Sequence, residues 1–371
     1  MYPASHRRRP WPSCAARVGV LAALLLLTPA ALADEQDEDD APPRGHYELP
    51  EEGNVVGESY SVTVEDEEQT LVDIAREHNL GYEEIVRANP EVSIWVPGEG
   101  TEVEIQARFI LPEAEQEGIV INIAELRLYY YPELEEDEPR RVETYPIGIG
   151  REGYDTPLGE TETTMKLKDP AWYPPESMRE EAEEAGEEPP EVVPPGPDNP
   201  LGEHAILLDI PGYLIHGTNR PDGIGMRASR GCIRMFPEDI ESVFERVPEG
   251  TRVNIIDQPI KVGRQDERPL VQVFEPLEEQ EHGMMALVET LDRVNQANEA
   301  GIDFDYEQLR DLLESPNGQV VALEPASQEE EKERGPENLY EALEGSARDT
   351  EAGSDESRPE RFLEALELEE A

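Results

Sequence analysis

The chain has 371 residues, of which 86 are acidic and 31 are basic, and its formal net charge is −55 at pH 7. A charge of this size repels nucleic acid and anionic lipid, so the composition argues against partners of either kind. Concentrated salt would screen the self-repulsion, and we therefore expect a host that lives in high external salt. The length allows two folded units with unstructured flanks, and a hydrophobic content of 37% fits real cores beside a large solvated fraction.

Residues 1–33 have the pattern of a secretory signal peptide. Arginines at four of the first seventeen positions precede an apolar run, Val18 to Leu27, which is too short for a typical spanning helix. Ala31-Leu32-Ala33 is a small-x-small cleavage pattern. We expect cleavage after Ala33, which would deliver the mature protein outside the cytoplasm without stable membrane insertion. The alternative is an uncleaved membrane anchor.

The segment after the signal peptide predicts a linker and then a small α+β unit. Residues 34–57 begin as an acidic stretch with prolines, typical of a linker. Alternating and helical periodicities in residues 58–112 then predict strand, helix, helix and strand. The expected elements are a strand at Tyr60–Val64, a helix at Leu71–His78 with Thr70 as N-cap, a helix at Tyr82–Ala88 ended by Asn89-Pro90, a strand at Glu102–Ile105 and a closing segment at Phe109–Pro112.

From Gly118 the pattern becomes β-rich, and residues 118–257 predict a mainly β domain, a sandwich or mixed sheet. Between its two halves, Trp172 to Gly202 is a long irregular excursion with a short acidic helix, and such excursions inside compact domains are usually functional. The expected strands are Ile119–Ile123, Glu125–Tyr131, Arg141–Gly150, Glu160–Lys168, His204–Leu208, Tyr213–Ile215 and Thr251–Ile256, with a helix at Pro237–Glu245.

The remainder of the chain is less regular. Residues 258–320 are expected to form a C-terminal extension with helices at Met284–Asn298 and Tyr306–Leu313. Residues 321–371 are acidic and poor in aromatic residues, which predicts a disordered tail with at most a terminal helical stretch.

Cys232 is the only cysteine that remains after removal of the signal peptide, because Cys14 leaves with it. An unpaired thiol in an oxidising compartment is a liability unless its chemistry is used. It sits in Ser229-Arg230-Gly231-Cys232-Ile233-Arg234, sixteen residues after His216 of His216-Gly217-Thr218. A thiol with an imidazole within folding reach predicts nucleophilic catalysis.

The residues suggest a role for each member of this constellation. Cys232 would attack an amide carbonyl, and His216 would take the thiol proton and return one to the leaving amine. Either the Ser229 hydroxyl or the Gly217 carbonyl would orient the imidazole. Backbone N–H groups around Gly231 and Cys232 would stabilise the oxyanion, and Arg234 would bind a substrate carboxylate.

The β-rich domain resembles the YkuD-type L,D-transpeptidase family. His216-Gly217-Thr218 and Ser229-Arg230-Gly231-Cys232-Ile233-Arg234 match the family's two motifs, although many members carry histidine at the position of Arg230. Three further stretches are similar to its ErfK/YbiS/YcfS-like branch: Ala124–Tyr131, Tyr145–Gly150 and Val192–Gly202. The resemblance implies that the catalytic residues are Cys232 and His216, supported by Ser229 and Gly217. It also implies that the substrate is bound by Arg234, Gly231 and Thr218.

Residues 58–112 resemble a LysM module, which binds the N-acetylglucosamine-containing glycan of peptidoglycan or chitin. The resemblance rests on Tyr60-Ser61-Val62, Leu71–Ala75, Ile85–Pro90 and Ile110-Leu111-Pro112. Glu65-Asp66-Glu67-Glu68 replaces the usual glycine-rich first turn. A rigid spacer that has lost its affinity for glycan is therefore the alternative interpretation.

The family resemblance implies a peptidoglycan tetrapeptide stem as donor. Cys232 would form a thioester with loss of D-Ala, and an acceptor amine would then resolve it. That amine would belong to the lysine of an outer-membrane lipoprotein or to a second stem, giving a 3→3 cross-link; with water the enzyme would be an L,D-carboxypeptidase. Two alternatives are a wall-binding tether with weak or idle catalysis and a general cysteine endopeptidase. The sequence shows no metal-ligand spacing and no nucleotide-phosphate loop, so we expect no cofactor and no metal.

The charge generates the first prediction. Activity and thermal stability are expected to persist in molar salt and to fall as salt is removed, because the unscreened acidic residues then repel one another. Melting curves and turnover measured from dilute buffer to molar sodium chloride test this. Unchanged stability and activity in dilute buffer would contradict a high-salt origin.

Overall fold

The computed structural model describes residues 44–134, 138–184, 186, 188–265, 268–277, 284–298, 301 and 304–326. The expected signal peptide, the first part of the expected linker and almost all of the expected tail lie outside the described residues. Everything described belongs to one compact unit that begins at Pro42.

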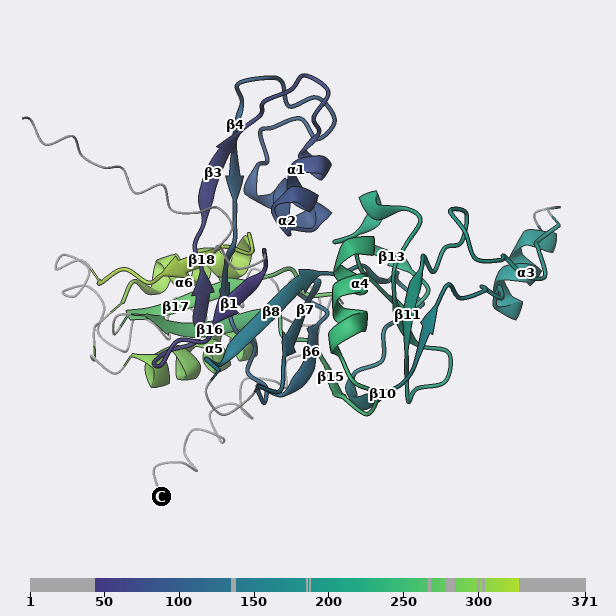
Figure 1. Ribbon diagram of the computed structural model, residues 1–371. Helices are drawn as coiled ribbons and strands as arrows, with labels where there is room; N and C mark the ends of the chain where they lie inside the picture. Colours follow the sequence, from purple (N-terminus) through teal and green to yellow (C-terminus); the bar gives the residue numbers. More distant parts are fainter. Residues whose placement is uncertain are drawn as a thin grey trace, which may run out of the picture. The chain divides into compact units, whose positions relative to one another are not determined.

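A nine-stranded mixed sheet forms the centre of the structure, which confirms the mainly β fold class (Figure 1). Two of its neighbouring pairs are parallel, β6 with β15 and β12 with β14, and the other pairs are antiparallel. In spatial order the strands are β1 (His46–Glu48), β8 (Arg141–Pro146), β7 (Arg127–Tyr131), β6 (Gly118–Asn122), β15 (Arg252–Ile256), β10 (Gly159–Lys168), β11 (His204–Leu208), β12 (Leu214–His216) and β14 (Ile233–Arg234). A short parallel pair, β9 (Ile149–Gly150) with β13 (Arg227–Ser229), lies outside this sheet.

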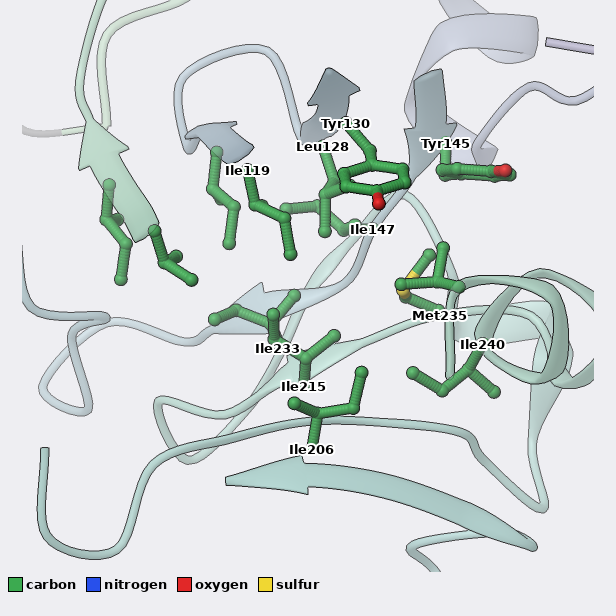
Figure 2. Packing of buried hydrophobic residues seen from close by; sticks show 14 of the residues in the cluster. Ile119, Leu128, Tyr130, Tyr145, Ile147, Ile206, Ile215, Ile233, Met235 and Ile240 are labelled. Atoms are coloured by element: carbon green, nitrogen blue, oxygen red, sulfur yellow. The ribbon is translucent and has the colours of Figure 1, made fainter. Parts of the chain in front are cut away.

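Every residue of β6 and β7 is buried, because both faces of these strands pack against a hydrophobic core. Successive side chains of a strand point to opposite faces. Ile119 and Leu128 accordingly enter one core, whereas Val120 and Tyr129 enter the other. Figure 2 shows Ile119, Leu128 and Tyr130 in the first core. The helix α4 (Pro237–Arg246) contributes Ile240 to the same core.

The expected strand–helix–helix–strand order of the small unit is present. It comprises β3 (Tyr60–Thr63), α1 (Leu71–Glu77), α2 (Tyr82–Ala88) and β4 (Glu102–Ile105), and β3 pairs with β4. Thr70 is the N-cap of α1 as predicted: its hydroxyl accepts from the Asp73 N–H at 3.1 Å, and the Asp73 carboxylate accepts from the Thr70 N–H at 2.9 Å. The resemblance of this unit to a LysM module stays a prediction.

Strands that the sequence did not predict lie within residues 34–57 and in the C-terminal extension. Within residues 34–57, β1 pairs with β8, and β2 (Val55–Gly57) pairs with β5 (Arg108–Ile110). A strand of three residues is too short to show a recognisable alternation of apolar and polar side chains. Such strands form because tertiary contacts pair them with a neighbouring strand.

The C-terminal extension has the two predicted helices, α5 (Met284–Ala297) and α6 (Tyr306–Glu314). It also has a three-stranded sheet of β16 (Ile260–Gln265), β17 (Arg268–Val273) and β18 (Val320–Ala322). Lys261 in β16 is fully buried, and a lysine at a core position hides a strand from a hydrophobicity pattern. The helix α3 (Glu176–Glu184) lies at the tip of the excursion between β10 and β11 (Figure 1).

Two buried ion pairs join parts of the chain that are distant in sequence. Lys261 Nζ donates to Glu125 Oε1 and to the Ile110 carbonyl, both at 2.6 Å, and neither charged side chain is exposed. Arg127 of β7 donates to Glu84 of α2 at 2.8 Å and is likewise fully buried. Burial lowers the pKa of Lys261, and the Glu125 carboxylate opposes that shift, so the lysine depends on its partner for its charge.

The Lys261–Glu125 pair generates a stability prediction. Lys261→Met is expected to lower the free energy of unfolding by about 3–5 kcal/mol, because it leaves the Glu125 carboxylate buried without its counter-charge. Urea denaturation in molar salt measures the loss.

A matched control is Arg252→Met, since Arg252 forms exposed ion pairs with Glu115 and Glu160. We expect it to cost less than about 1 kcal/mol. The double variant Lys261→Met/Glu125→Gln is expected to recover part of the loss. Equal effects of Lys261→Met and Arg252→Met would contradict this interpretation of the buried pair.

Candidate active site

The two sequence motifs meet on neighbouring strands. His216 is the last residue of β12, and Cys232 immediately precedes β14. The two strands are parallel, with Ile215 opposite Ile233 and His216 opposite Arg234. The short parallel pairing therefore brings the two motifs side by side across a gap of sixteen residues.

Side-chain alternation places the reactive groups on one face of these strands. Ile215 and Ile233 are fully buried and point into the first core, where Figure 2 shows them together with Ile206 of β11. Their neighbours along each strand must point to the opposite face. Cys232, His216 and Arg234 consequently share that face, with Arg234 opposite His216 and Cys232 one position from Ile233.

His216 is buried, and its orientation is set by the backbone. Its Nδ1 lies 2.6 Å from the Gly217 carbonyl oxygen. A carbonyl can only accept, so Nδ1 carries the proton and Nε2 keeps its lone pair. Burial and then the charge of Arg234 lower the pKa of His216 to about 4, against opposing hydrogen bonds to the Gly217 and Leu201 carbonyls. The imidazole is therefore a neutral base at pH 7.

Cys232 is a partly buried thiol. Its Sγ donates a weak hydrogen bond to the Gly212 carbonyl at 3.5 Å. Burial raises the pKa of the Cys232 thiol, while a backbone hydrogen bond from Leu214 and the charge of Arg234 act in the opposite direction. Thiol and imidazole are thus both neutral at rest, and forming the thiolate requires proton transfer to a base.

Ser229 holds the turn before the nucleophile and is not the hydrogen-bond partner of the imidazole. Its hydroxyl donates to the Cys232 carbonyl at 2.6 Å and accepts from the Gly231 N–H at 3.2 Å. Of the two orienting groups considered from sequence, the Gly217 carbonyl is the one that contacts His216.

Gly231 is required by the geometry of the same turn. Its φ of +100° is a conformation that L side chains rarely adopt, and an added Cβ would lie 2.8 Å from the ring of Tyr213. Its N–H is occupied by Ser229, so of the two backbone donors expected for an oxyanion the Cys232 N–H is the better candidate. Thr156 supports the turn from the other side by donating to the Gly231 carbonyl at 2.9 Å.

Arg234 is partly buried, and its main chain is anchored by reciprocal hydrogen bonds with Gly148 at 2.8 and 2.9 Å. Within the described part of the chain, its buried Nε has no hydrogen-bond partner and its guanidinium forms no ion pair. Burial lowers the pKa of Arg234. A guanidinium near the thiol with an unused Nε donor would suit an anionic group of a substrate, and the contact of Arg234 with a substrate carboxylate stays a prediction.

The remaining predicted residue, Thr218, is buried, and its hydroxyl accepts from the Arg220 N–H at 3.0 Å. Its contact with substrate stays a prediction. Sequence reasoning missed Leu201, whose carbonyl raises the pKa of His216, and Tyr213, whose ring lies against Gly231. The only signal for Leu201 was its place in the stretch Val192–Gly202, which was noted for its family resemblance.

The described residues contain neither a metal-binding cluster nor a helix that could span a membrane. Among them, no group of three or more histidine, cysteine, aspartate or glutamate side chains is arranged to hold a metal ion. Within the same residues, the helices are all too short or too polar to cross a membrane.

The sequence profile of YkuD, the L,D-transpeptidase catalytic domain, matches residues 116–255. The chain is 42% identical over 282 residues to "Probable L,D-transpeptidase YcfS" of Escherichia coli K12, covering 74% of this chain and 87% of that protein. It is 40% identical over 284 residues to "Probable L,D-transpeptidase YbiS" of the same strain, covering 75% and 91%. It is 43% identical over 235 residues to "Probable L,D-transpeptidase ErfK/SrfK", covering 62% and 74%.

These matches confirm the resemblance to this branch, and both motif residues, His216 and Cys232, lie within the matched domain. The chain therefore belongs to the YkuD family of L,D-transpeptidases.

Proposed function

We propose that this protein is a periplasmic L,D-transpeptidase that acylates Cys232 with a peptidoglycan tetrapeptide stem and transfers the stem to an acceptor amine. The observation that carries the proposal is the shared face of β12 and β14, on which Cys232, His216 and Arg234 lie together. A nucleophile, a neutral base and an uncommitted cation are the three groups that acyl transfer from a carboxylate-bearing peptide needs.

In the first half-reaction, His216 Nε2 takes the Cys232 proton as the sulfur attacks the carbonyl carbon of the third stem residue. The Cys232 N–H stabilises the oxygen that becomes negative. The intermediate collapses by breaking the bond to the terminal D-Ala, whose nitrogen receives the proton from His216. The products are free D-Ala and a thioester on Cys232.

In the second half-reaction, an acceptor amine attacks the thioester carbonyl and gives a proton to His216. Collapse breaks the carbon–sulfur bond, and Cys232 recovers its proton. One amide is broken and one is formed, so the cycle needs no external energy source. We propose the lysine of an outer-membrane lipoprotein as the first choice of acceptor and a second stem, which gives a 3→3 cross-link, as the other; water would give an L,D-carboxypeptidase.

The proposed location follows from the substrate and the N-terminal pattern. Peptidoglycan lies outside the cytoplasm, and residues 1–33 have the composition of a cleaved signal peptide. The small unit formed by β3, α1, α2 and β4 is proposed to bind the glycan of the same polymer. Trp95 and Val96, in the loop before β4, are 60% and 68% exposed and give this unit an apolar surface on which a sugar ring could stack.

The acyl-enzyme is the first test of the proposal. Incubation of residues 34–371 with a tetrapeptide-stem muropeptide is expected to add the acyl group to the Cys232 peptide and to release D-Ala in equal amount. Mass spectrometry with and without an acceptor amine detects both products and identifies the amine used.

Cys232→Ala is the control and is expected to lower D-Ala release by at least about 10³-fold, because it removes the nucleophile. Binding of the Cys232→Ala variant to the cell wall would not distinguish an enzyme from a wall-binding tether, because both would bind. The absence of an adduct and of D-Ala release, in dilute and in molar salt, would favour a wall-binding tether.

The pH profile of acylation is the second test, because acylation requires His216 in its neutral form. The profile of the wild type is expected to fall only near pH 4, where His216 becomes protonated. Arg234→Met removes a positive charge that lowers the pKa of His216, so the acid limb is expected to move to higher pH.

The same Arg234→Met variant also loses the proposed contact with the substrate carboxylate, which is expected to lower kcat/KM by about 10- to 100-fold.

Brief pH jumps in molar salt give these rates before the acidic protein associates near its isoelectric point. Arg227→Met is the matched control, since Arg227 donates to the Leu277 carbonyl and is not among the charges that act on His216. A limb that stays in place in Arg234→Met, or that moves equally in Arg227→Met, would refute the assigned coupling.

A further inference from the structure

The excursion between β10 and β11 is closed at its base by backbone pairing. Trp172 and Val193 exchange hydrogen bonds of 2.9 and 2.8 Å, and the Asp169 N–H donates to the Glu203 carbonyl at 2.7 Å. Close to this base the chain makes a tight turn at residues 196–202 before it enters β11. Residues 196–198 of this turn are exposed, but the polar residue at its centre is buried.

That centre is the side chain of Asn199, which is fully buried. Its Nδ2 donates to the Pro170 carbonyl at 2.8 Å and lies 3.3 Å from the carbonyls of both Val193 and Pro194. Its Oδ1 accepts from the Leu201 N–H at 2.9 Å. One amide therefore ties the two ends of the excursion together and fixes the direction in which the chain leaves at Leu201.

The chain that leaves this turn lies directly against the catalytic histidine motif. The Leu201 carbonyl oxygen lies 3.3 Å from the Cβ position of Gly217, and it is one of the two backbone carbonyls that raise the pKa of His216. Gly202 has a φ of +67°, and a Cβ there would approach the Thr218 nitrogen to 2.9 Å. Backbone 201–202 therefore packs against backbone 217–218 without room for a side chain.

We propose that Asn199 is a positioning residue for the His216 base. Its amide holds the turn at 199–202 in the one shape that keeps the Leu201 carbonyl and the Gly202 backbone against His216-Gly217-Thr218. The proposal rests on the proposed function only in taking His216 as the base of Cys232.

The consequence of losing this support follows from geometry. The Gly217 carbonyl holds Nδ1 of His216, and the nearby Leu201 carbonyl raises the pKa of the same imidazole. Gly217 belongs to the same strand end as the histidine, whereas Leu201 reaches it only through the turn that Asn199 holds. Displacement of a reacting group by about 1 Å can cost on the order of 10²-fold in rate.

The test uses the full mature chain, three single variants and one double variant. Asn199→Ala is expected to slow acylation of Cys232 by about 10- to 100-fold. Asn199→Ser is expected to fall between wild type and Asn199→Ala, because a serine hydroxyl still accepts from the Leu201 N–H, more weakly. Gly202→Ala breaks the same contact from the other side, so Asn199→Ala/Gly202→Ala is expected to be less than additive.

The decisive readout is the pH profile of Cys232 alkylation by iodoacetamide, which needs no peptidoglycan substrate. The Leu201 carbonyl favours the protonated imidazole. Its loss in Asn199→Ala is therefore expected to move the acid limb to lower pH and to lower the plateau, since a weaker base produces less thiolate. A purely structural role would lower the melting temperature and leave the profile of the folded protein in place.

Asn219→Ala is the matched control. Asn219 is exposed and donates to the Asp198 carbonyl at 3.1 Å, so it links the same two segments without touching Leu201. We expect a wild-type profile for this variant.

A wild-type profile in folded Asn199→Ala, or rates that fall only in proportion to the folded fraction, would overturn the proposal. A profile that moves as expected in a protein that stem peptides do not acylate would uphold the positioning role and reject the transpeptidase function.

Discussion

The parallel pairing of β12 with β14 is the constraint on which the active site depends. It is only two residues long, yet it fixes which side chains share a face. Ile215 and Ile233 bury one face of the pair in the first core, so Cys232, His216 and Arg234 must occupy the other. A slip of one residue would send the catalytic groups into the core. The hydrophobic packing of two isoleucines thereby specifies the register that the chemistry uses.

The electrostatics of the site contrast with those of the chain. The whole protein carries a net charge of −55, but the charged group that shifts the pKa of both the thiol and the imidazole is the guanidinium of Arg234. Together with burial, that charge keeps His216 neutral. Proton transfer between two neutral groups, with the thiolate formed as it attacks, is the mechanism that this arrangement favours. The same guanidinium is available to the carboxylate of the substrate.

Much of the fold could be predicted from local patterns. The capping box at Thr70, the limits of α2 and the strand β11 all follow from spacing and from terminating residues such as Asn89-Pro90. What could not be predicted depends on tertiary contacts. β16 could not be predicted because it carries a lysine, Lys261, at a core position. That lysine can be buried only because it pairs with Glu125, which lies far away in the sequence.

The same division applies to the active site. Residue type and motif were enough to predict the site residues Cys232, His216 and Arg234 from the sequence. The sequence could not decide whether Ser229 or Gly217 hydrogen-bonds to the imidazole, because both belong to the two motifs. The folded backbone shows that Gly217 contacts His216, whereas Ser229 bonds within its own turn. Asn199 acts through the main chain of Leu201 and Gly202, and no spacing in the sequence connects it with His216.

The central claim is that the Gly217 carbonyl holds His216 with its proton on Nδ1, so that a neutral Nε2 is free to accept the thiol proton. Nitrogen-15 NMR of the histidine side chains, titrated in molar salt, tests this directly when His216 is assigned with a His216→Gln variant. The account predicts the neutral Nδ1–H tautomer at pH 7 and protonation only near pH 4. An Nε2–H tautomer, or an imidazolium at neutral pH, would contradict it.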